Sequence, residues 1–127
     1  MLNPVDLSMP ARPEWALIAR SVVLSYASTV GMASSRLQDL SLVIGQLWEE
    51  VAHSPGVTLT SVRTALVDEA MRLEVEGIGD GETLDDESEG WSSPLASQVV
   101  RHLANDVSLQ RSSEHLRIEA FFPLAVS

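Results

Sequence analysis

The sequence contains no cysteine, so it can form neither a disulfide bond nor a thiol nucleophile. Lysine is missing as well, because all eight basic residues are arginine. A chain without lysine has no Schiff-base chemistry and no phosphate-loop lysine. The N-terminus also lacks the basic start and apolar core of an export signal. Together these absences predict a cytoplasmic protein.

Long apolar runs are absent too. Although 45% of the residues are hydrophobic, no stretch approaches the roughly eighteen apolar residues that a membrane-spanning helix needs. A chain of 127 residues is long enough for one hydrophobic core and too short for two ordinary ones. We therefore expect one soluble domain over residues 1–127, without contact to a membrane.

Positive charge is scarce. Eighteen acidic residues stand against eight arginines, which gives a net charge of −10. Such a charge repels a phosphate backbone, and the sequence shows no basic cluster that could offset it. We expect no direct binding to nucleic acid.

The sequence does contain clear hydrophobic periods. Alternating apolar residues predict strands over residues 5–10, 61–67, 71–77, 107–111 and 116–122. Apolar steps of three and four residues predict three helices, which begin near Pro13, near Ser34 or Ser35, and at Pro94 behind a serine cap. The residues expected on the buried stripes are Trp15, Ile18, Val22, Tyr26 and Val30 in the first helix, Leu37, Leu40, Ile44, Leu47 and Val51 in the second, and Leu95, Val99 and Leu103 in the third.

This order of elements indicates the fold class. Most of the strands are linked as hairpins, and the helices are long enough to lie across them. We therefore predict an α+β fold, a two-layer sandwich in which a mixed, mostly antiparallel sheet carries three helices on one face. Leu73 and Val75 are expected on one side of their strand, and Leu116, Ile118 and Ala120 on one side of the last strand.

Glycine and acidic residues gather in one stretch. Gly77, Gly79 and Gly81 occupy alternate positions, and a run of acids follows them as far as Trp91. Two unit charges about 4 Å apart interact by about 1 kcal/mol in water and about 4 kcal/mol at a protein-like dielectric constant. Without Mg²⁺ this stretch should therefore reject a triphosphate. We expect a solvated acidic lid at about residues 79–91, since its spacing does not fit a Ca²⁺ loop.

Several segments together resemble a known family. The second predicted helix carries DLSLVIGQ (residues 39–46), and ANDVSL (residues 104–109) follows the third. With the hairpin that ends in Gly-x-Gly-x-Gly, they resemble the anti-sigma-factor serine kinases of the histidine-kinase-like ATP-binding superfamily, whose second helix carries Asp-(Ile or Leu)-x-Leu-Ala-Val-Gly-Glu. The resemblance covers nearly the whole chain and implies a single bacterial domain with the histidine-kinase-like ATPase (Bergerat) fold.

The resemblance implies that the catalytic positions are altered. In active members a Glu on the second helix helps to activate the attacking hydroxyl, and an Asn one turn later holds Mg²⁺. This sequence has Gln46 and Glu50 there. A neutral amide cannot take up a proton near neutral pH, so no catalytic residue is expected at Gln46. Glu50 could ligate a hard cation, but as a charged group it does not simply replace an amide.

The nucleotide-binding positions are altered in the same way. The Asp that reads adenine in the family would stand at Gly77, and residues 92–94 replace a second glycine motif with two serines and Pro94, which has no N–H. The resemblance thus implies a degenerate ATP cleft at Glu50, Gly77, Gly79 and Gly81.

Two tryptophans are candidate contacts for a partner. Trp48 lies one step off the ideal stripe of its helix, beside two glutamates, and we expect it to be partly exposed. Trp91 stands in the acidic lid. Its side chain either contacts a partner or covers the nucleotide cleft that no longer binds ATP. The three histidines share no ligand spacing, so no metal site is expected.

Three interpretations stay open. The first is a regulator with a degenerate ATP site that acts by protein–protein binding in sigma-factor control, without a cofactor. Its partner would be a sigma factor or an anti-sigma-factor antagonist, and the family pattern implies a homodimer. The second is an active serine kinase that uses ATP and Mg²⁺ to phosphorylate such an antagonist. The third is a structural or oligomerising domain.

Overall fold

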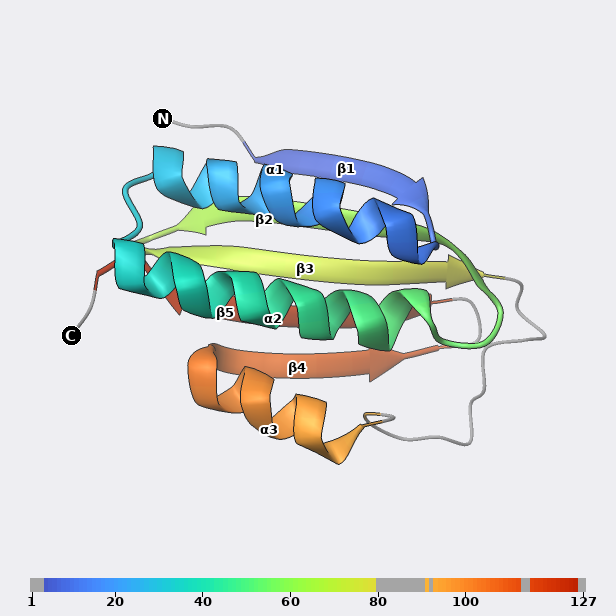
Figure 1. Ribbon diagram of the computed structural model, residues 1–127. Helices are drawn as coiled ribbons and strands as arrows, with labels where there is room; N and C mark the ends of the chain where they lie inside the picture. Colours follow the sequence, from blue (N-terminus) through green and yellow to red (C-terminus); the bar gives the residue numbers. More distant parts are fainter. Residues whose placement is uncertain (1–3, 80–90, 92, 113–114, 126–127) are drawn as a thin grey trace.

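The computed structural model describes residues 4–79, 91, 93–112 and 115–125. They form one sheet with three helices on one of its faces (Figure 1). The elements follow one another as β1 (Val5–Pro10), the 3-10 turn η1 (Pro13–Trp15), α1 (Ala16–Thr29), α2 (Ser34–Ala52), β2 (Val57–Val67), β3 (Ala70–Gly79), α3 (Pro94–Leu103), β4 (Asn105–Arg111) and β5 (His115–Pro123). None of the helices in this part of the chain combines the length and apolar character that a membrane span requires.

The strand order is β1-β2-β3-β5-β4, and each neighbouring pair is antiparallel. The predicted two-layer α+β fold is confirmed. Among the described strands the sheet is antiparallel rather than mixed. The reason is the insertion of β5: α3 returns the chain so that β4 runs in the same direction as β3, but β5 lies between them and pairs with both.

The core lies between the sheet and the helices. Leu73 and Val75 are buried on β3, and Leu116, Ile118 and Ala120 are buried on β5, which confirms the predicted strand faces. Val75 stands opposite Ile118 in the β3–β5 register, so both strands present their apolar side chains to the same helices. This shared face aligns the sheet beneath α2.

The β2–β3 hairpin is longer than predicted. β2 begins at Val57 instead of residue 61, and Val67 pairs with Ala70 across a turn that consists of Asp68 and Glu69. Asp68 has φ of 55°, a left-handed conformation that Asp tolerates better than most side chains. The longer β2 brings the chain directly from the end of α2 onto the sheet.

The predicted stripe of α1 is correct at Tyr26, which is buried, and wrong at Ile18. Ile18 is 45% exposed, and the buried positions are Ala19, Val23, Tyr26 and Ala27. The prediction counted from Trp15 at 3.6 residues per turn. Trp15 ends η1, which turns more tightly at three residues per turn, so the true stripe is shifted.

The stripe of α3 is shifted for a different reason. Leu95 is 70% exposed, whereas Ala96 and Val100 are buried. Small alanine side chains let α3 approach its neighbours closely, and the prediction followed the larger residues instead. Ser93 caps α3 as expected, since its side chain accepts a hydrogen bond from the Ala96 amide. The predicted serine cap of α2 is wrong, because its N-cap is Ala33.

The sheet face away from the helices carries a charged network. Arg63 Nε lies 3.0 Å from Asp6 Oδ2, and Arg63 Nη1 lies 3.1 Å from Glu74 Oε1. Glu74 is only 6% exposed, so Arg63 compensates a nearly buried carboxylate. The hydrogen bond to Asp6 is the main cause that raises the pKa of Arg63 above its ordinary value. A cation whose pKa is raised by folding stabilises the fold at every pH below its unfolded-state pKa. The contribution of Arg63 is therefore constant near neutral pH.

Replacing Arg63 by Gln should lower Tm by a few degrees, because Glu74 loses its nearest cation at a cost of about 1–3 kcal/mol. Arg72→Gln is the matched control: Arg72 lies 4.0 Å from Glu119, and both side chains are partly exposed, so its loss should hardly change Tm. Thermal unfolding followed by circular dichroism measures both. Equal losses in the two variants would contradict the special role of Arg63.

Candidate functional site

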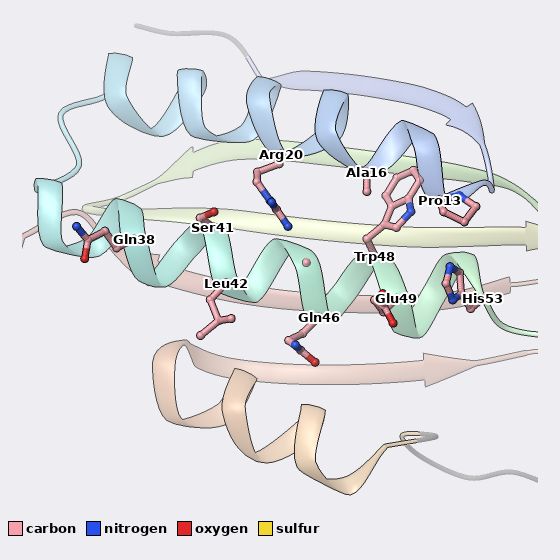
Figure 2. Close-up of a pocket in the computed structure, with 11 residues that line it drawn as sticks. Pro13, Ala16, Arg20, Gln38, Ser41, Leu42, Gln46, Trp48, Glu49 and His53 are labelled. Carbon is pink, nitrogen blue, oxygen red and sulfur yellow. The ribbon is translucent and has the colours of Figure 1, made fainter.

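The second helix brings Gln46 and Glu50 to neighbouring turns. Their spacing of four residues in α2 places the two side chains on the same side of the helix. Figure 2 shows Gln46 pointing away from α1, toward the side on which α3 lies. The two positions that correspond to the base and the Mg²⁺ ligand of the resembled family are therefore adjacent in the structure, at the boundary between α2 and α3.

Glu50 contacts the beginning of α3. Its side chain is buried, with 4% exposed, and Oε1 accepts a hydrogen bond from the Ser93 amide at 3.4 Å. Ser93 Oγ in turn accepts a hydrogen bond from the Ala96 amide at 3.2 Å. The start of α3 is the place that the family resemblance assigns to the phosphates. Here that place holds a carboxylate.

The glycines of β3 are required by packing. Gly77 is buried, and a Cβ atom built on it would lie 2.8 Å from Val51 Cγ1 and 3.0 Å from the Val57 methyl groups. A Cβ atom on Gly79 would lie 2.1 Å from the Gly56 carbonyl oxygen. A side chain that reads adenine has no room at Gly77. The predicted positions Gly81 and most of the acidic lid lie outside the described residues.

The described residues offer little chemistry for phosphoryl transfer. Gln46 has no basic site for a proton. Within the part of the chain that the structure describes, no group of three or more His, Asp and Glu side chains is placed to hold a metal ion. If Mg²⁺ bound to this protein, Glu50 and the amide oxygen of Gln46 would be its nearest ligands on α2.

The two predicted partner-binding tryptophans are both largely covered. The expected exposure of Trp48 is wrong, since its side chain is 3% exposed. Trp91 is half-buried and packs against the core, with a buried Nε1 atom. A partner could reach Trp48 only through the groove above it.

That groove runs between α1 and α2. It encloses about 460 Å³ and is lined by Pro13, Ala16, Arg20, Gln38, Ser41, Leu42, Gly45, Gln46, Trp48, Glu49 and His53. In Figure 2, Arg20 projects from α1 toward α2, and the Trp48 ring projects back toward Ala16 and Pro13. Arg20 Nε and Trp48 Nε1 are both buried without a hydrogen-bond partner. The groove therefore contains two unsatisfied donors.

Gly45 makes room for the Arg20 side chain. A Cβ atom at Gly45 would lie 2.9 Å from Arg20 Nη2, so the guanidinium rests directly on the backbone of α2. No acidic residue of the described chain lies within ion-pair distance of Arg20. Most of the other arginines have such partners: Arg12, Arg36, Arg63, Arg72 and Arg117 each pair with a carboxylate. Arg20 thus brings an uncompensated positive charge to a strongly acidic protein.

Sequence reasoning missed Arg20, although a signal was present. Arg20 is the only charged residue between Ala16 and Thr29, and α1 provides no acid to pair with it. A single charge in an otherwise apolar and small-residue helix indicates a specific contact, within the protein or outside it. Only the structure shows that, among the described residues, no acid pairs with Arg20.

Comparison with known proteins supports the fold. No family model matches this chain, and no curated protein matches it in sequence. The structure is similar to the crystal structure of the RsbU and RsbW domains of a Mycobacterium tuberculosis protein, with a TM-score of 0.74 and 14% sequence identity. The alignment covers 99% of this chain and 34% of that chain, so this chain spans about a third of its neighbour's length. At this identity the likeness shows the fold alone.

Restoring the family's acid at Gly77 should damage the fold instead of restoring adenine recognition. Gly77→Ala should cost about 1–3 kcal/mol by overpacking against Val51, and Gly77→Asp more, because it also buries a carboxylate. Gly45→Ala is the control: its nearest neighbour is the flexible end of Arg20, and alanine favours a helix interior. Thermal unfolding with and without MgATP measures all three. A Gly77→Asp variant that keeps its Tm and gains nucleotide binding would show the packing argument to be wrong.

Proposed function

We propose that this protein is a regulator of the anti-sigma-factor type that acts by binding another protein and has lost nucleotide-dependent phosphorylation. The RsbW-like fold supports the regulatory class. The packed position of Gly77 and the amide at Gln46 support the loss of the kinase reaction. The partner is a sigma factor or an anti-sigma-factor antagonist, and two copies of this chain pair as a homodimer.

The observation that carries the binding role is the uncompensated charge of Arg20 in the α1–α2 groove. A buried donor without a partner is costly, and it is satisfied best by an acceptor from outside. A guanidinium matches a carboxylate in geometry and charge. The groove therefore suits an acidic side chain of a partner protein that pairs with Arg20.

An active serine kinase is the second candidate. It is favoured by one observation, the closeness of Glu50 on α2 to the capped start of α3, which is where the family binds phosphate and Mg²⁺. The kinase needs a base, however, and Gln46 cannot serve as one. Binding of MgATP separates the two candidates.

Millimolar MgATP should leave the Tm of this protein unchanged. A ligand at 100 times its Kd stabilises a fold by about 2.7 kcal/mol, which is a shift of several degrees in a domain of this size. Differential scanning fluorimetry with ATP alone, Mg²⁺ alone and both together tests the expectation. A shift that requires both ATP and Mg²⁺ would support the kinase instead.

Reversing the charge of Arg20 should weaken partner binding at least tenfold without a loss of stability. Arg20→Glu places a like charge opposite the partner's acid, and Arg20→Gln should give an intermediate loss. The control is Arg101→Glu, the same charge change on the exposed surface of α3, where Arg101 contacts only Ser97 and the Val107 carbonyl.

Surface plasmon resonance against immobilised sigma factors and antagonist proteins of the same organism measures the affinities, and thermal unfolding checks the fold. Equal affinities of wild type and Arg20→Glu would place the interface elsewhere. A wild-type protein that binds none of these partners would contradict the regulatory role.

A further inference from the structure

A carboxylate occupies the start of α3. Glu50 projects from α2, is 4% exposed, and accepts the Ser93 amide hydrogen at 3.4 Å. In Figure 1, α2 and α3 run in opposite directions, so the last turns of α2 lie beside the first turn of α3. The contact therefore joins the end of one helix to the beginning of the next.

The amide donors at this end of α3 are mostly engaged. The Ser93 amide donates to Glu50, the Ala96 amide donates to the Ser93 hydroxyl, and Pro94 has no N–H. The N-terminus of a helix attracts an anion through such donors and through the helix dipole. A carboxylate there satisfies the same electrostatic demand that a bound phosphate would satisfy.

We propose that Glu50 is a built-in anion that takes the place of a ligand phosphate at the start of α3 and excludes phosphate from it. The carboxylate occupies a donor that phosphate would use, and its charge repels a second anion at the same position. It also fastens α3 to α2 in the absence of nucleotide. This role extends the loss of nucleotide binding described under the proposed function, and it does not depend on the α1–α2 groove.

Glu50→Gln is the central test, because it keeps the size of the side chain and removes its charge. The amide hydrogen of Ser93 should exchange with solvent at least tenfold faster, since a neutral amide oxygen is a weaker acceptor than a carboxylate. The affinity for inorganic tripolyphosphate, measured by isothermal titration calorimetry, should rise at least tenfold. Unchanged values of both quantities would overturn the proposal.

The neighbouring residue provides a matched control. Glu49 is exposed and lines the α1–α2 groove, and the hydrogen bond to the Ser93 amide comes from Glu50, so Glu49→Gln removes the same charge without touching that contact. It should change neither the exchange of the Ser93 amide nor the tripolyphosphate affinity. An equal gain of affinity in Glu49→Gln would mean that only net charge matters, and would overturn a specific role of Glu50.

Glu50→Asp separates the hydrogen bond from the charge. It shortens the side chain by one methylene group, so the Ser93 amide should exchange faster while tripolyphosphate stays excluded. The wild-type protein offers a test that needs no variant: a Ser93 amide that exchanges as fast as in an unfolded chain overturns the proposal.

Failure of this proposal can be told apart from failure of the proposed function. A wild-type protein that binds none of the sigma factors and antagonist proteins would overturn the regulatory function and leave the Glu50 contact unaffected. The exchange rate of the Ser93 amide in Glu50→Gln reports on the Glu50 contact alone, whether or not any partner protein binds.

Discussion

A methyl group of Val51 fills the space beside Gly77, and this contact sets how closely the end of α2 approaches the sheet. A side chain at Gly77 would push α2 away, so the absence of a Cβ atom on β3 is a condition for the observed packing. The same approach brings Glu50, the residue before Val51, to the start of α3. One close contact thus links the bare backbone at Gly77 with the position of the buried carboxylate.

The arginines of the two sides of the sheet differ in their partners. On the open face of the sheet, Arg63 links Asp6 of β1 to Glu74 of β3 and holds three strands together. On the helical side, Arg20 lies against Gly45 with no acid near it in the described chain. A protein with a net charge of −10 has ample acids to pair with this arginine. That no acid among the described residues does so is the reason for placing the partner's acid in the groove.

In the proposed function, a protein ligand takes the place of a nucleotide ligand. The Ser93 amide at the start of α3 is bonded to a carboxylate of the chain itself, and Gly77 is packed against Val51 and Val57. The α1–α2 groove keeps two buried donors that the chain leaves unsatisfied. A domain arranged in this way needs no phosphate to hold α2 and α3 together, and it retains a polar surface that an outside acceptor can complete.

The sequence by itself determined the class and order of the elements, because alternation with a period of two and steps of three and four are local properties of the chain. The strand faces of Leu73, Val75 and Ile118 followed from the same alternation, and the altered Gln46 could be recognised by residue type. The tertiary structure alone decided the phase of α1 and α3, which depends on the tight turn at Trp15 and on close packing through Ala96. It also decided that Trp48 is covered, that Glu50 reaches Ser93 and that Arg20 lies beside none of the acids whose positions are described. These facts depend on distances between residues far apart in the chain, which local periodicity does not encode.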